Sequence, residues 1–221
     1  MSSNTSISQG KDVERFFDSY ASDFNSIYQV DERPIINKTI DKWARSSMFL
    51  RFERVYQICQ EIGAKNLLDV GCGPGYHDTI LAKGLNINIT GVDVADNMIK
   101  IAEEATKEAG VQNICSFEVA DFMKFQSDKK FDAVLSLGVV EYIMDPEPFI
   151  KRMMTFSNNV VMFSLPVKWH WLTPQRVIRY KARHCPLKFY SYFELASLLQ
   201  AMGVNYKIDR LKRDYIVTIS V

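Results

Sequence analysis

Short apolar runs alternate with longer amphipathic segments through the middle of this chain. The apolar runs, each bounded by polar or turn-forming residues, predict buried strands at 66–70, 87–92, 114–119, 131–137 and 160–165. Between them, apolar residues at helical spacing predict one helix that begins near residue 77 and others over 95–109 and 146–155. Strands and helices that alternate in this way predict an α/β fold with a doubly wound, mainly parallel sheet covered on both faces.

The segments on either side of this alternating region follow different patterns. Aromatic residues recur at helical spacing over 13–28, and a second helix is predicted from Pro34 to Glu61, with Gly63 suited to end it. Toward the other end, 191–201 predicts a helix, and 205–221 predicts two strands with a short break between them. Such a break suits an antiparallel hairpin. We therefore expect a Rossmann-like sheet of seven strands with a C-terminal antiparallel hairpin and an N-terminal helical cap.

Composition and cysteine spacing narrow the class of protein. The 221 residues are 47% hydrophobic and 24% charged with a formal net charge of +1, which is typical of a globular domain. We expect a disordered tail at 1–12, the helical cap at 13–62, and a main domain at 63–221. No apolar run is long enough to predict a membrane span, and the four cysteines form no CxxC pair. No metal site is therefore expected, and the expected location is the reducing cytoplasm.

The segment NLLDVGCGPG (66–75) leads from a predicted strand into a helix through a glycine-rich turn. Such turns bind anions through backbone N–H groups, but the dinucleotide fingerprint G-x-G-x-x-G requires a glycine where this chain has Tyr76. Asp69, at the end of the strand, would be unfavourable beside phosphate and favourable beside an ammonium group. The pattern therefore favours a ligand with an amino acid group over a dinucleotide.

Two further acids follow the next two predicted strands. Asp93 ends the second strand, where a carboxylate can accept hydrogen bonds from both hydroxyl groups of a ribose. Asp121 follows the third strand and could accept from the amino group of adenine, while Phe122 and Met98 offer apolar or polarisable surface to the ring. Together these residues predict a ligand that contains an amino acid, a ribose and an adenine, and no phosphate.

In this order, the motifs resemble those of class I S-adenosylmethionine-dependent methyltransferases, of the type that acts on small molecules. The matching segments are LLDVGCGPG (67–75), TGVDVADNMIKIAEE (90–104), VADF (119–122) and FDAVLSLGVVEYIMDPE (131–147). The resemblance covers 66–165 and, more loosely, 13–61, where aromatic-rich helices commonly cap the cofactor in such enzymes. It implies S-adenosylmethionine as the cofactor, with S-adenosylhomocysteine as the product.

The resemblance also implies which residues bind each part of the cofactor. The glycine turn and Asp69 would hold the methionine part, Asp93 the ribose, and the segment after the third strand the adenine. The residues implied are Asp69, Gly71, Cys72, Gly73, Gly75, Asp93, Val94, Met98, Asp121, Phe122, Leu137 and Gly138, of which the last two would line the methyl-transfer channel. Arg51 is a candidate for the methionine carboxylate, with a solvated helix charge as the alternative. Tyr20 and Tyr28 are candidate cofactor contacts, although aromatic residues at helical spacing favour a core position.

Methyl transfer from a sulfonium requires alignment and exclusion of water more than it requires a charged catalytic group. Many small-molecule members have Glu-His after the fourth strand, whereas this chain has Glu141-Tyr142. The resemblance therefore implies no base at this position, and these two residues are candidates to position a substrate, with a turn-capping role for Glu141 as the alternative. His170 in VKWHWLTP is the candidate general base, with a surface histidine as the alternative.

A basic, aromatic insertion is expected at about 166–190, on the substrate side. The span 149–193 has no aspartate or glutamate, and its basic residues are Lys151, Arg152, Lys168, Arg176, Arg179, Lys181, Arg183 and Lys188. Aromatic residues lie among them, at Trp169, Trp171, Tyr180, Phe189 and Tyr190. This basic, aromatic stretch favours an anionic or cyclic biosynthetic intermediate as the acceptor, with an amphipathic helix over 173–184 as the alternative interpretation.

The preferred function is methylation of such a small molecule at O or N. An RNA or protein methyltransferase and a non-catalytic S-adenosylmethionine-binding subunit are the alternatives. The near-neutral charge and the lack of a recognisable nucleic-acid module count against RNA. The sequence does not predict an oligomeric state.

Overall fold

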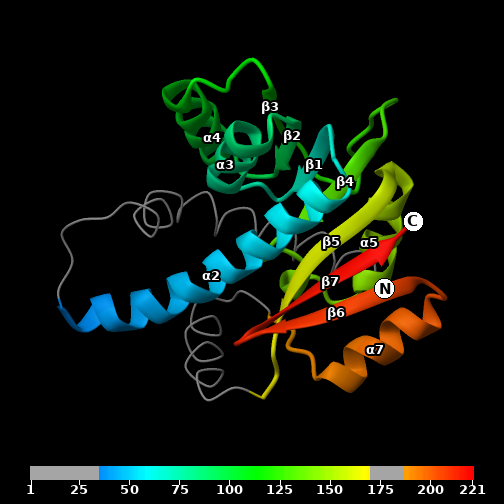
Figure 1. Cartoon of the computed structure of the whole chain (residues 1–221). Coiled ribbons are helices and arrows are strands. Elements are labelled where there is room, and N and C mark those ends of the chain that lie inside the picture. The colour runs from blue at the N-terminus through cyan, green and yellow to red at the C-terminus, as the bar shows by residue number, and fades with distance from the viewer. Residues whose placement is uncertain (1–34, 170–186) are drawn as a thin grey trace, which may run out of the picture.

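The computed structural model describes residues 35–169 and 187–221, and a seven-stranded sheet lies at its centre (Figure 1). The strands are β1 (Asn66–Val70), β2 (Asn88–Asp93), β3 (Cys115–Val119), β4 (Phe131–Ser136), β5 (Ser157–Pro166), β6 (Asn205–Leu211) and β7 (Asp214–Ser220). Their order is β3-β2-β1-β4-β5-β7-β6, in which β1 to β5 pair in parallel and β7 is antiparallel to both of its neighbours. The predicted parallel sheet with a C-terminal antiparallel hairpin is therefore confirmed.

The helices also follow the predicted pattern closely. They are α2 (Ile35–Glu61), α3 (Tyr76–Leu85), α4 (Asp96–Ala109), α5 (Pro146–Phe156) and α7 (Tyr192–Ala201), with a short 3-10 helix at Val140–Tyr142. Gly63 follows α2 with a φ of 61°, and Gly110 ends α4 with a φ of 74°, a left-handed conformation that glycine adopts at little cost. Figure 1 shows α3 and α4 beside the half of the sheet formed by β1 to β3, and α7 beside β6.

Helices cover both faces of the sheet, which is why its central strands are apolar at successive residues. In β1, Leu67 packs into a cluster with residues of α2 and α3, whereas Leu68 packs into a second cluster with residues of α5 and α7. Successive side chains of a strand point to opposite faces, so each leucine contributes to a different core. Both leucines are fully buried.

The start of β5 differs from its prediction over 160–165, because the strand begins at Ser157. Asn158 and Asn159 are exposed and polar, so they carry no apolar signal. Backbone pairing extends the strand here, since Phe131 of β4 pairs with Ser157. An apolar pattern therefore locates the buried part of a strand and misses the part that backbone hydrogen bonds alone hold in the sheet.

The strand order locates the edge where a ligand is expected. Strand β1 lies between β2 and β4, so the connections that follow β1 and β4 diverge from a common point. In open α/β sheets, ligands bind outside the carboxyl ends of the strands at such a switch point. The segments that follow Val70 and Ser136 are therefore the first place to search for a site.

The predicted division into tail, cap and main domain stays a prediction. The tail and the first cap helix lie outside the described residues, as does most of the basic insertion at about 166–190. The second half of α2 packs on the sheet through the buried residues Val55, Ile58 and Cys59. Within the described ranges, no helix is both long and apolar enough to cross a membrane, and no three histidine, cysteine or acidic residues are grouped as metal ligands.

The capping box at the start of α7 gives a test of the fold. Ser191 Oγ accepts a hydrogen bond from Glu194 N at 3.3 Å, and Ser191 N donates to Glu194 Oε2 at 2.7 Å. We expect Ser191→Ala to lower the free energy of unfolding by about 1 kcal/mol, measured by urea denaturation. Ser197→Ala, at an exposed position inside the same helix, should leave stability unchanged or slightly raised. Equal stability of the two variants would contradict the role of the cap.

Candidate functional site

The turn that joins β1 to α3 is built by three glycines. Gly71, Gly73 and Gly75 have φ values of 76°, 54° and 67°, in the left-handed region that side chains disfavour. A Cβ at Gly71 would lie 2.2 Å from Val139 Cγ2, and one at Gly75 would lie 2.7 Å from Ala102 Cβ. At Gly73, by contrast, a Cβ would meet no atom within 4 Å. The outer glycines are thus needed for packing, and the turn is open at the middle one.

Asp93, at the end of β2, connects this turn to the start of α4. Its Oδ2 accepts a hydrogen bond from Gly73 N at 2.9 Å, and its Oδ1 accepts from Ala95 N at 2.9 Å. Burial raises the pKa of Asp93, and the hydrogen bonds from Ala95, Gly73 and Val94 oppose that shift. A carboxylate has about four lone-pair sites, so capacity remains to accept hydroxyl groups of a ligand. The predicted ribose role of Asp93 is compatible with this geometry and stays a prediction.

A second acid lies against Asp69, and sequence reasoning missed it. Asp78, in the first turn of α3, is fully buried, and Asp69 at the end of β1 is nearly so. Among the described residues, neither oxygen of Asp78 nor Oδ1 of Asp69 has a hydrogen-bond partner other than the carboxyl group that it faces. Burial raises the pKa of Asp78 to about 7, and burial together with the nearby charge of Asp78 raises that of Asp69 well above its usual value. Neither carboxyl group therefore lies in surroundings that favour its ionised form.

The spacing of Asp78 carried a signal that could have revealed its burial. Asp78, Leu81 and Ala82 recur at helical spacing, and all three are buried. An apolar stripe that includes one acid predicts a buried carboxyl group. An acid in the first turn of a helix also interacts favourably with the helix dipole, so the sequence alone does not indicate a role for Asp78 in a site.

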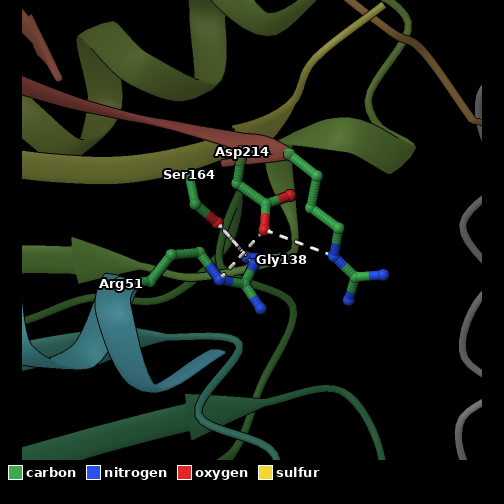
Figure 2. A network of polar contacts seen from close by, with 5 residues as sticks. Arg51, Gly138, Ser164 and Asp214 are labelled. Atoms are coloured by element: carbon green, nitrogen blue, oxygen red, sulfur yellow. Dashed lines mark hydrogen bonds and ion pairs between the residues drawn. The ribbon is translucent and has the colours of Figure 1, made fainter. Parts of the chain in front are cut away.

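Arg51 of α2 lies at the carboxyl end of β4 in a network that joins three elements (Figure 2). Its Nη1 donates to Ser164 Oγ of β5 at 3.2 Å, and its Nε lies 3.7 Å from Asp214 Oδ2 at the start of β7. Gly138 N also donates to Ser164 Oγ, at 2.8 Å. A Cβ at Gly138 would lie 3.9 Å from Arg51 Nη1, so the guanidinium borders the predicted methyl-transfer channel. Arg51 is therefore a largely buried charge and not a solvated one, while its role toward a carboxylate stays a prediction.

Arg152 of α5 donates hydrogen bonds to the backbone of the predicted adenine segment after β3. Arg152 Nε donates to Phe122 O at 2.8 Å, and Nη2 donates to Phe125 O. The Phe122 ring packs in the core, where its centroid lies 5.1 Å from that of the Phe149 ring and 5.8 Å from that of the Phe156 ring. Asp121 is exposed, and its Oδ1 accepts from Met123 N at 3.0 Å. The carboxyl group of Asp121 therefore faces outward, whereas the Phe122 ring faces the interior.

The remaining predicted site residues are placed as follows. Met98 is buried beside Ala95, and Cys72, Val94 and Leu137 are partly buried. Glu141 and Tyr142 are buried in the 3-10 helix after β4, where Glu141 O accepts from Lys188 N at 2.8 Å. Tyr20, Tyr28 and His170 lie outside the described residues. The structure therefore brings together the candidates that follow β1, β2 and β4.

The described members of the predicted basic stretch all have partners within the chain. Lys151 pairs with Glu147 at 2.7 Å, and Lys168 pairs with Glu194 at 2.6 Å. Lys188 donates to Met144 O at 3.0 Å, and Arg152 holds the backbone carbonyls described above. The other four basic residues, at 176–183, lie outside the described ranges. The four described basic residues of this stretch thus make contacts within the chain.

The raised pKa of Asp78 predicts how stability depends on pH. Because the folded pKa is raised to about 7, the stability that the protonated group contributes is fully present below the unfolded pKa and is lost by the time the pH has passed about 7. We expect the stability of the native chain relative to Asp78→Asn to fall by up to about 1.4 kcal/mol per pH unit between about pH 4 and about pH 7. Urea denaturation across pH provides the measurement. Asp128→Asn, at an exposed acid, should track the native chain, and a constant difference between native and Asp78→Asn would contradict the raised pKa.

Solved structures show the same arrangement of elements. Magnesium protoporphyrin IX methyltransferase from Synechocystis PCC 6803, with bound SAH, superposes with a TM-score of 0.76 at 17% identity, covering 96% of this chain and 99% of that one. The DhpI–SAH complex superposes with a TM-score of 0.67 at 17% identity, covering 95% of each chain. At this level of identity, the likeness concerns the fold.

Curated relatives share part of the sequence. Ajmaline N-methyltransferase from Rauvolfia serpentina is 35% identical over 96 residues, which is 43% of this chain and 33% of the relative. The mitochondrial ubiquinone biosynthesis O-methyltransferase from Arabidopsis thaliana is 29% identical over 132 residues, which is 58% of this chain and 41% of the relative. The matched region therefore spans less than half the length of either relative.

A family model described as a methyltransferase domain matches residues 63–175. This range starts just before β1, includes the glycine turn with Asp69, Asp78 and Asp93, and continues through β4 and β5. It comprises just over half of the 221 residues. The chain therefore belongs to the methyltransferase domain family.

Proposed function

We propose that this chain is an S-adenosylmethionine-dependent methyltransferase that acts on a small-molecule acceptor. The observation that carries the proposal is an open backbone turn at Gly73 bordered by the acids Asp69 and Asp93. A diphosphate would meet these negative charges, whereas an amino acid ammonium group would be attracted to them. Structures with bound SAH and with bound SAM among the structural neighbours support the same ligand.

The geometry supports a division of roles along the cofactor. Asp69 and the open turn at Gly73 would hold the methionine part, and Asp93 the ribose. The exposed carboxyl group of Asp121 is the candidate for the adenine amino group. Because the Phe122 ring is packed in the core, only the backbone of that residue is a candidate contact. Arg51, beside Gly138, is the candidate partner for the methionine carboxylate.

S-adenosylmethionine would supply an activated methyl group on a positively charged sulfur with a neutral leaving group. The protein's part is then to align the acceptor with that methyl group and to exclude water. Gly138 and Leu137 follow β4 at the switch point, where the acceptor would approach. Glu141 and Tyr142 are held in the next turn and are candidates to position the acceptor. His170 stays the candidate base.

The acceptor is proposed to be a small molecule because the curated relatives are named as N- and O-methyltransferases of small molecules. An anionic acceptor would depend on the four basic residues at 176–183, since the described basic residues are already paired. The cytoplasm stays the proposed location, in keeping with the free thiols of Cys59, Cys72 and Cys115.

Ligand binding tests the function directly. We expect S-adenosylhomocysteine to raise the melting temperature of the chain and NAD to leave it unchanged, because only a ligand that binds the folded state stabilises it. With methyl-labelled S-adenosylmethionine, label should enter the small-molecule fraction of an extract. Label in RNA or protein would favour the alternative acceptors. Stabilisation by NAD and not by S-adenosylhomocysteine would overturn the proposal.

Asp93 provides a residue-level test. We expect Asp93→Ala to weaken S-adenosylhomocysteine binding by at least about 1 kcal/mol, roughly fivefold, because hydrogen bonds to a charged acceptor are lost. Isothermal titration calorimetry measures the change. Asp96→Asn, three residues further along and exposed beside Lys100, is the matched control and should bind normally. Unchanged affinity in a folded Asp93→Ala variant would contradict the ribose assignment.

A further inference from the structure

We propose that Asp78 and Asp69 form a proton-sharing carboxyl pair that gives up its proton to solvent when the ammonium group of the ligand binds. Asp78 would thereby act as a positioning residue that helps the site select a ligand with an amino acid group. The inference rests on the proposed function for the identity of that ligand. Its geometric basis is that both acids are buried, Asp69 on the strand before the glycine turn and Asp78 on the helix after it.

The two acids come from elements that pack together at the carboxyl end of β1. Asp69 lies in β1, and α3 begins with Tyr76 directly after the turn. On the sheet-facing side of α3, Asp78 has no exposed surface, and among the described residues its oxygens have no hydrogen-bond partner other than the Asp69 carboxyl group. An isolated buried carboxylate is unfavourable by several kcal/mol, so such a group takes up a proton or a counter-charge. Two adjacent carboxyl groups ionise one at a time.

One further acid adds negative charge beside the pair, whereas the nearby thiols stay neutral. Asp93 at the end of β2 raises the pKa of Asp69, and burial together with the charge of Asp78 raises the pKa of the thiols of Cys72 in the turn and Cys115 on β3. Burial, with a smaller effect from Arg51, lowers the pKa of the neighbouring His77 to about 4, so His77 is neutral at physiological pH. Within the described ranges, no cation contributes to the shift of either acid. A proton or a cationic ligand is therefore the available source of positive charge.

Ligand and proton then compete for the same carboxyl pair. Without ligand, the pair holds a proton that joins the two groups by a hydrogen bond. An ammonium group brings its own positive charge and favours the ionised pair, so the proton passes to the solvent. One ligand is bound and one proton is released, with no other bond made or broken. By linkage, a release of protons on binding requires that affinity rise with pH.

Calorimetry in two buffers of different ionisation enthalpy tests the inference on the full chain. For S-adenosylhomocysteine near pH 7, we expect release of up to about one proton, with affinity rising by up to about tenfold per pH unit. Asp78→Asn can donate to Asp69 from its amide, so it should release no proton and lose the pH dependence. The exposed Asp128→Asn variant should behave like the native chain. 5′-Methylthioadenosine, which lacks the amino acid, should release none.

The outcomes separate this inference from the proposed function. Binding of S-adenosylhomocysteine to the native chain without proton release would overturn the pair and leave the function standing. Equal release by native and Asp78→Asn would also overturn it. If neither the native chain nor Asp128→Asn binds S-adenosylhomocysteine, the proposed function fails. The infrared carbonyl band of a protonated carboxyl group, present in the native chain and lost in Asp78→Asn, would then decide whether the pair holds a proton.

Discussion

The carboxylate of Asp93 determines the shape of the candidate site. It accepts one hydrogen bond from Gly73 and one from Ala95, and so fixes the glycine turn relative to the start of α4. Buried backbone N–H groups need acceptors, and here one side chain serves two of them. The turn can stay open over Gly73 because this carboxylate orders the backbone from one side. A ligand would then find the carboxylate acceptor already in place, which lowers the entropy lost on binding.

Acidic side chains lie on one side of the glycine turn, and the guanidinium of Arg51 lies on the other. Near β1 and β2, Asp69 lies within electrostatic reach of Asp78 and Asp93, and burial raises the pKa of all three carboxyl groups. Near β4, the Arg51 guanidinium is paired with Asp214 and with the Ser164 hydroxyl. A zwitterion would match this separation of charge, with its ammonium toward the acids and its carboxylate toward the arginine. A dinucleotide would match only the second half.

Most of the fold follows from the sequence, because its signals are local. Strand β1 was predicted from its apolar run, and the helix ends from Gly63 and Gly110. The first residues of β5 were not, because Asn158 takes part in the sheet without being buried.

The candidate site is less predictable, since its contacts join residues that are distant in the chain. The partners of Arg51 come from β5 and β7, and nothing near residue 51 identifies them. The same holds for the Phe122 ring, which a local pattern places equally well on a ligand or in the core, and for Arg152, whose partners are backbone carbonyls. The spacing of Asp78 indicates a buried position, but only the packing of α3 on the sheet places it beside Asp69.

The position of β7 between β5 and β6 has a consequence for biosynthesis. Arg51, Gly138 and Ser164 leave the ribosome well before Asp214, so the guanidinium lacks its counter-charge while most of the sheet can already form. An unpaired buried arginine opposes packing of α2 onto the sheet. The pairing of Arg51 with Asp214 therefore awaits the strand that is translated last of the seven, and a nascent chain that stops short of it would keep the end of α2 open to chaperones.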